Sequence, residues 1–209
     1  MGSNNNYKHI NYAETLKIMD GRKYINEENV IYYLPSDKEE SDRLNIEHYL
    51  LRYIWQGNFS PKIEKGLIKG NKKVIDLGCG AEQCWLIDMS LKYPLSTFIG
   101  IDIVATPSLS QDKPENLAFL QHNLLEHPGV PFPDETFDFV YMRNLGFTID
   151  NWIHVINEAA RVTNSNGYIE IANYDVYRDI KEDNHGGPIY YKLHCSCMYI
   201  QYIYIFYQL

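Results

Sequence analysis

The sequence predicts an α/β fold in which helices cover both faces of a doubly wound, mostly parallel β-sheet. Two observations support this prediction. From residue 73 onward, short apolar runs alternate with helix-compatible segments, as is typical of strands buried on both faces. The first of these runs closes on an acid and two glycines, and the second closes on another acid. With 209 residues, 45% of them hydrophobic, the chain is long enough for one domain with a hydrophobic core.

The pattern divides the chain into four regions. They are a loose N-terminal end (1–20), an N-terminal helical lid segment (21–70), the sheet-containing core (71–175) and an atypical tyrosine-rich tail (176–209). The first region is polar and without a clear period, so we expect either no regular structure there or a weak helix around Ala13 to Met19.

A lid helix is expected in the second region. Ser36 and Glu39 have the spacing of a capping box, which predicts that the helix begins at Ser36 and ends near Gly57. Its apolar side would carry Leu44, Leu51, Ile54 and Trp55. We favour packing of this stripe against the domain over direct contact with a substrate, since apolar residues at helical spacing usually face a core.

The core elements are expected in alternating order. The strands are Val74–Leu77, Thr97–Asp102, Leu117–Leu120, Thr136–Met142 and Gly167–Ile171, and the helices are Ala81–Lys92 and Asn151–Val162. Five strands with interleaved helices predict a doubly wound sheet.

The segment around Gly78 and Gly80 predicts a site for a nucleotide-type cofactor. A Cβ at either glycine would obstruct the turn after the strand and the approach of a ligand to the main chain. Asp102 ends the second strand 22 residues after Gly80, near the offset at which a carboxylate meets a ribose hydroxyl in dinucleotide folds. Asp102 is therefore a candidate ribose ligand, with a helix N-cap as the alternative.

A nicotinamide or flavin site is disfavoured. Its fingerprint requires a third glycine for close packing of helix on strand, and the matching residue here is Gln83. Asp76 precedes the glycines and is expected to face a crevice in which the ammonium group of a zwitterionic ligand fits.

Composition excludes several classes of function. A formal charge of −8 argues against general binding of nucleic acid or of anionic membranes. The four cysteines come without an apolar leader, which favours an intracellular setting, cytoplasmic or nuclear. Cys195 and Cys197 lack the second ligand pair of a zinc site, so no metal is expected. The apolar tail falls short of the about 18 residues that a membrane span needs.

Several segments, taken together, resemble class I S-adenosylmethionine (SAM)-dependent methyltransferases. VIDLGCG resembles their motif I, GIDI their motif II and PFPDETFDFVYMR the segment around their fourth strand, while VINEAARVTNSNGYIEI is similar to the following helix and fifth strand. The stretch from Gly21 to Phe59 is similar, more narrowly, to the lead-in of fungal methyltransferases related to the regulator LaeA. The resemblance implies a Rossmann-like, SAM-binding core and methyl transfer to a small-molecule or protein acceptor.

The resemblance also implies a set of cofactor-binding residues. Asp76, Gly78, Cys79 and Gly80 would surround the methionine part of SAM, Asp102 and Ile103 would lie at the ribose, Asn123 and Leu124 beside the adenine, and Arg143 at the mouth of the methyl-transfer pocket. Arg22 and Tyr24 would fold over the cofactor, with a surface arginine and a packing tyrosine as the alternative. Spacing singles out no catalytic residue.

The sequence departs from the family pattern at two places. Ala81 to Cys84 stand where relatives have a glycine-containing turn, and the tail replaces the usual helix and antiparallel strand pair after the fifth strand. We expect that pair to be missing, with the tail forming either one added strand or a foreign end left by truncation. These departures keep a second hypothesis open, namely a catalytically impaired protein that acts as a SAM-binding or regulatory partner of another protein.

Overall fold

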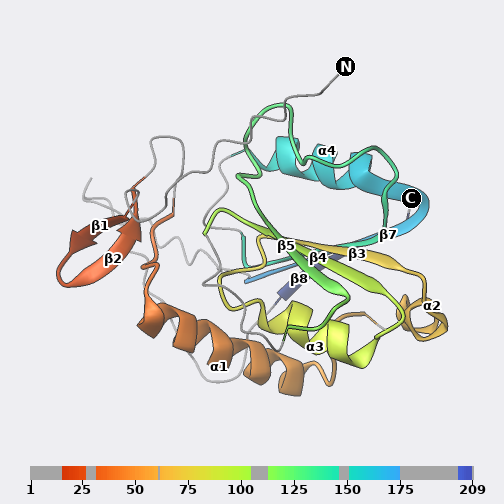
Figure 1. The fold of residues 1–209 in the computed structure, drawn as a ribbon, viewed down its shortest axis with the longest axis horizontal. Helices are drawn as coiled ribbons and strands as arrows, with labels where there is room; N and C mark the ends of the chain where they lie inside the picture. Colours follow the sequence, from red (N-terminus) through yellow and green to blue (C-terminus); the bar gives the residue numbers. More distant parts are fainter. Residues whose placement is uncertain are drawn as a thin grey trace, which may run out of the picture.

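The computed structural model describes residues 16–26, 32–60, 62–104, 113–145, 151–174 and 202–208. These residues form one six-stranded sheet with helices on both faces and, beside it, a separate two-stranded hairpin (Figure 1).

The sheet is doubly wound, as the sequence predicts. Its strands are β3 (Lys73–Leu77), β4 (Thr97–Asp102), β5 (Leu117–Gln121), β6 (Phe137–Arg143), β7 (Thr163–Tyr174) and β8 (Tyr202–Gln208). Their order is β5-β4-β3-β6-β7-β8, and all neighbours are parallel except β8, which is antiparallel to β7. The chain winds outward from β3 in both directions, so β3 and β6 flank the switch point at which such sheets bind ligands.

Within the described ranges, four helices complete the layers: α1 (Lys38–Ile54), α2 (Glu64–Lys69), α3 (Cys84–Lys92) and α4 (Trp152–Val162). Figure 1 shows α4 on one face of the sheet and α3 with α1 on the other. On the α4 face, Val155 and Ala159 belong to a buried apolar cluster with the sheet. On the other face, Trp85 of α3 stacks on Tyr141 of β6 with ring centroids 4.0 Å apart.

The first core helix begins later than predicted. The sequence predicts a start at Ala81, whereas α3 begins at Cys84. Gln83 explains the difference, because its φ of 52° is left-handed and cannot continue a right-handed helix.

The prediction of a weak helix before residue 20 is wrong for its described part. Leu16–Met19 (β1) and Arg22–Ile25 (β2) form an antiparallel hairpin, and residues 13–15 lie outside the described residues. Asp20 and Gly21 connect the strands with φ of 49° and 78°, the positive values that a two-residue type I′ turn requires. The Asp-Gly pair is thus a hairpin signal that the sequence contains.

The helix predicted in the second region forms close to its predicted bounds but presents a different face. Its N-cap is Asp37 instead of Ser36, because the Asp37 side chain accepts a hydrogen bond from the Glu40 N–H at 3.1 Å. The side chains buried on α1 are Glu40, His48 and Leu51. The predicted apolar stripe is wrong for Ile54, which is 50% exposed. It belongs instead to a large apolar surface on the outer side of α1, made of Ile46, Tyr49, Leu50, Tyr53 and Ile54.

The tail adds one strand. β8 pairs antiparallel with β7 in a register that sets Ile205 opposite Ile171, so β7 is not the edge of the sheet. Cys195, Cys197 and His194 lie outside the described residues. Within the described ranges, no three His, Cys, Asp or Glu side chains are arranged to hold a metal ion. No helix in that same part of the chain has the length and apolar character needed to cross a membrane.

Candidate functional site

The candidate site lies where β3 and β4 end and the glycine turn begins. Gly78 and Gly80 have φ of 80° and 72°, values that favour glycine. The N–H groups of Gly78 and Cys79 both donate to the carbonyl of Ile101, at 2.8 and 3.0 Å, which holds the turn against the end of β4.

The two glycines serve different purposes. A Cβ on Gly78 would overlap the Leu145 side chain, so this glycine is required for packing. A Cβ on Gly80 would meet nothing within 4 Å, so any side chain there would occupy open space beside the turn. The Cys79 thiol is turned toward β4, since a Cβ on Gly100 would lie 2.7 Å from the Cys79 sulfur. Cys79 therefore contributes to the turn through its main chain.

Asp102 connects the end of β4 to the glycine turn. Its carboxylate accepts the Gly80 N–H at 2.8 Å and the Val104 N–H at 2.9 Å. Burial raises the pKa of Asp102, while the N–H groups of Val104, Gly80 and Ile103 oppose that increase. Because a carboxylate has about four acceptor sites, Asp102 retains capacity for a further donor such as a hydroxyl.

Asp76 is the second carboxyl of the site and the more deeply buried of the two. It is 4% exposed, and burial raises its pKa from 3.8 to about 7. The positive charge of Arg143 opposes this increase, whereas the neighbouring Asp102 adds to it. A positively charged ligand group near Asp76 would favour its ionised carboxylate, so the site is electrostatically suited to such a group.

Helix α1 contacts this end of the sheet through polar side chains. His48 Nδ1 lies 3.1 Å from Arg143 Nη2, and His48 Nε2 lies 3.1 Å from Asp88 Oδ2 on α3. Asn144, which follows Arg143, donates to the Glu47 carboxylate of the same helix. Sequence reasoning did not identify these α1 residues, since they lie 40 to 97 positions from their partners and have no motif spacing.

Three further predicted residues, Asn123, Leu124 and Ile103, make structural contacts outside the glycine turn. Asn123 follows β5 and its side-chain oxygen accepts the Leu125 N–H at 2.9 Å, so it shapes its own turn. Leu124 packs against the apolar cluster on the α4 face. Ile103 follows Asp102, and its carbonyl accepts a hydrogen bond from Gln121 at 2.9 Å.

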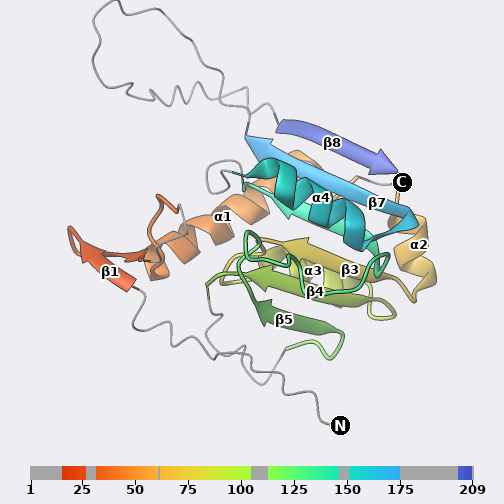
Figure 2. The same cartoon turned by 90° about the horizontal axis from the view of Figure 1, so that it is seen from above.

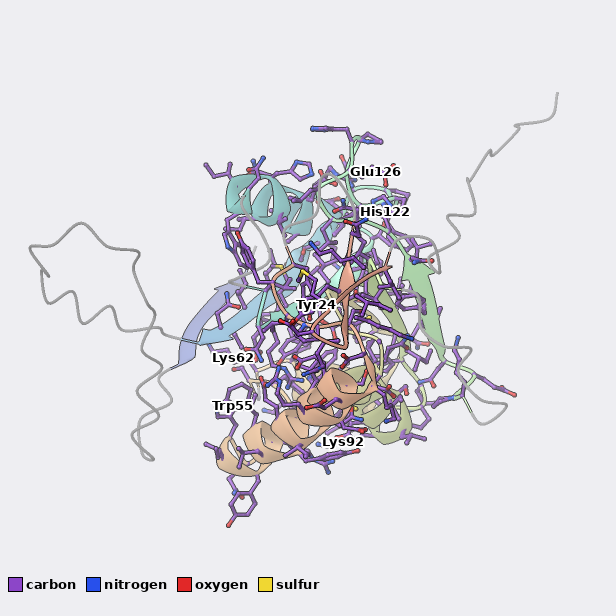
Figure 3. The ribbon with its side chains drawn as sticks, turned by 90° about the vertical axis from the view of Figure 1, so that its left-hand side faces the viewer. Tyr24, Trp55, Lys62, Lys92, His122 and Glu126 are labelled. Carbon is purple, nitrogen blue, oxygen red and sulfur yellow. The ribbon has the colours of Figure 1, made fainter. Side chains whose placement is uncertain are left out.

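Arg22 and Tyr24 lie on the hairpin. Arg22 forms two hydrogen bonds with Asp37, at 2.6 and 2.8 Å, and so ties β2 to the N-cap of α1. The hairpin lies on the side of the sheet toward which the parallel strands run (Figure 2). Figure 3 looks at the molecule from that side and shows Tyr24 near the centre of the view.

The strand order, with the glycine turn after β3 and Asp102 at the end of β4, defines a class I SAM-dependent methyltransferase fold. The chain belongs to the methyltransferase domain family, which matches residues 46–202. A SAM-dependent methyltransferase from Aquifex aeolicus has a similar fold, with a TM-score of 0.50 and 22% identity over 73% of this chain and 78% of that chain.

Two fungal relatives are similar in sequence. The secondary metabolism regulator laeA of Coprinopsis cinerea is 29% identical over 161 residues, which is 75% of this chain and 39% of the relative. The protein-methionine methyltransferase laeA of Emericella nidulans is 28% identical over 147 residues, 68% of this chain and 35% of the relative. The chain thus spans well under half the length of these relatives.

Proposed function

We propose that this chain binds SAM at the crevice and transfers its methyl group to a small-molecule or protein acceptor. The observation that carries the proposal is the open space beside Gly80, whose N–H is held by the Asp102 carboxylate at the end of β4. In the proposed arrangement the methionine part of SAM is surrounded by Asp76, Gly78, Cys79 and Gly80. The ribose is held by Asp102 and Ile103, and the adenine is flanked by Asn123 and Leu124. Arg143 lies at the methyl-transfer pocket, and Arg22 and Tyr24 cover the site.

The residues present fit this cofactor. An ammonium group beside Asp76 would offset the cost of ionising a buried carboxyl, and Asp102 retains acceptor capacity for ribose hydroxyls. SAM supplies an electrophilic methyl carbon, so that the acceptor's lone pair forms the new bond as the carbon–sulfur bond breaks. The task of the protein is then to align the acceptor and exclude water.

The proposed acceptor is a small molecule or a protein, and the name of the Emericella relative makes a methionine side chain the first candidate to test. A thioether has no proton to lose on methylation, so such an acceptor requires no general base. We place the reaction inside the cell, in the cytoplasm or nucleus, which the free thiols of Cys79 and Cys84 support. The charge of −8 supports an acceptor other than bulk nucleic acid.

Titration calorimetry with SAM and with S-adenosylhomocysteine tests the binding step. Gly80→Ala is expected to weaken binding by about tenfold or more, because the new methyl group enters the space assigned to the cofactor. Gly21→Ala is the matched control, since Gly21 has a similar φ of 78°, no heavy atom within 4 Å of a new Cβ, and a position on the hairpin turn. Equal affinities for both variants, or no binding by the wild-type chain at millimolar cofactor, would refute the assignment.

Methyl transfer is tested separately from binding. Incubation of the wild-type chain with methyl-labelled SAM and a cell lysate is expected to label an acceptor, and Gly80→Ala is expected to reduce the labelling at a SAM concentration below saturation. Binding without any labelled acceptor would instead support the second candidate, a SAM-binding regulatory partner. The glycine-free segment Ala81–Gln83, with its buried Gln83, is the observation that favours that candidate.

A further inference from the structure

We propose that His48 is a positioning residue that fixes the Arg143 guanidinium at the crevice and thereby couples the seating of α1 to cofactor binding. This inference rests on the proposed function of the crevice. His48 itself lies on α1 and contacts the site through Arg143.

The hydrogen bonds assign one protonation state to His48. A guanidinium can only donate, so His48 Nδ1, at 3.1 Å from Arg143 Nη2, must be the acceptor. The proton of a neutral imidazole is then on Nε2, which donates to Asp88 Oδ2 at 3.1 Å. Asp88 also receives hydrogen bonds from Arg52, at 2.5 Å, and from Asn58, at 3.4 Å, and is therefore held in place.

The environment of His48 favours this arrangement over simple filling of space. His48 is 1% exposed on a helix whose apolar side chains mostly face outward, and both of its ring nitrogens have polar partners. A buried position needed only for packing would be filled at lower cost by an apolar side chain.

The other end of this chain of hydrogen bonds is the cofactor crevice. Arg143 ends β6, two residues after Tyr141, which pairs with Asp76 of β3, and the charge of Arg143 opposes the increase in the pKa of that carboxyl. Displacement of α1 would remove the His48 acceptor from Arg143 and with it one of the contacts that position the guanidinium. The structure thus connects the lid helix to Asp76 through two side chains.

A fall in pH should break the hydrogen bond between His48 and Arg143. The groups that face His48 are Arg143 from β6, Asp88 from α3, and Arg52 and the Tyr49 ring from α1. Burial and the charge of Arg143 lower the pKa of His48, whereas Asp88 opposes the decrease. A protonated His48 would direct an N–H at Arg143 and place two cations together, so the contact holds above the ordinary histidine pKa and is lost as the pH falls.

A double-mutant cycle at pH 8 tests the coupling. His48→Ala and Arg143→Ala are each expected to weaken SAM binding by about tenfold, and the double variant no further, because either change breaks the same hydrogen bond. Additive losses would refute the coupling. If the wild-type chain does not bind SAM at pH 8, the proposed function fails instead, so the two failures are distinguishable.

The pH profile separates positioning from a structural role. Glutamine at position 48 offers an uncharged acceptor at every pH, so His48→Gln should bind SAM like the wild type at pH 8 and more tightly than the wild type at pH 5.5, where part of the wild-type His48 is protonated. Both proteins contain Asp76, so a difference in affinity that appears only at the lower pH is attributed to residue 48. His154→Gln, on α4, is the matched histidine control and should follow the wild type at both pH values. A constant ratio between His48→Gln and the wild type would overturn the proposal, and unfolding curves for each variant establish that it is folded.

Discussion

Glu170 lies in the middle of β7 with no exposed surface, and its replacement by glutamine should stabilise the fold. Both carboxylate oxygens accept the Ser60 N–H, at 3.1 and 2.9 Å. Burial raises the pKa of Glu170 from 4.5 to about 7 despite that bond. The folded state therefore favours the protonated carboxyl and is penalised where the group is ionised.

The size and sign of the effect follow from linkage. A pKa increase from 4.5 to about 7 corresponds to a cost of about 3 kcal/mol once the group is fully ionised. The stability that the folded state gains from a protonated Glu170 is fully present below pH 4.5 and is lost as the pH rises through about 7. Glutamine keeps an oxygen for the Ser60 N–H and cannot ionise, so the variant should avoid the loss.

Urea unfolding of wild type and Glu170→Gln at two pH values measures this difference. At pH 8.5 the variant should unfold with a free energy about 1 to 3 kcal/mol higher, and at pH 4.5 the two should agree within about 0.5 kcal/mol. Glu126→Gln, whose side chain is 61% exposed, is the control and should match the wild type. A Glu170→Gln variant destabilised equally at both pH values would show that ionisation of Glu170 carries no cost in the folded state and would refute the reasoning.

Three further predictions concern the crevice and the lid. Gly78→Ala should lower the unfolding free energy by about 2 kcal/mol or more, and Gly21→Ala by about 1 kcal/mol. Both changes strain the backbone, but only a Cβ at Gly78 also overlaps Leu145. Equal losses for the two variants in calorimetry would contradict this prediction. SAM binding at pH 6.5 should release protons from Asp76, and calorimetric titration in buffers of different ionisation enthalpy measures this release. The Asp76→Asn variant should lack this contribution. Unchanged proton release by the variant would exclude Asp76 as the source. Tyr53→Ser should change stability by less than about 0.5 kcal/mol in urea, since this side chain is 75% exposed; a large loss would mean that the outer side of α1 is covered.

The parts of the fold that the sequence predicts are those set by local patterns. The strand around Val74 is a continuous apolar run, and Gly78 and Gly80 mark a turn that few other residues can adopt. The pairing of Asp102 with the glycine turn follows from the fixed geometry of neighbouring parallel strands. These features need no knowledge of distant contacts.

The remaining features depend on contacts between distant segments. His48 and Asp88 are 40 residues apart, and neither stands in a recognisable motif. The outward apolar side of α1 reverses the usual amphipathic pattern, so periodicity alone assigned Ile54 to the wrong side. The late start of α3 depends on the left-handed backbone of Gln83, a residue type for which sequence gives no warning of that conformation.

The ion pair between Arg22 and Asp37 has a consequence for how the N-terminal elements form and open. The same carboxylate caps the first turn of α1 and binds the guanidinium of β2. Detachment of the hairpin would therefore leave the helix with a weaker cap, and fraying of the helix would release the hairpin. The β1–β2 hairpin and the first turn of α1 are thus expected to exchange their amide hydrogens as a single cooperative unit.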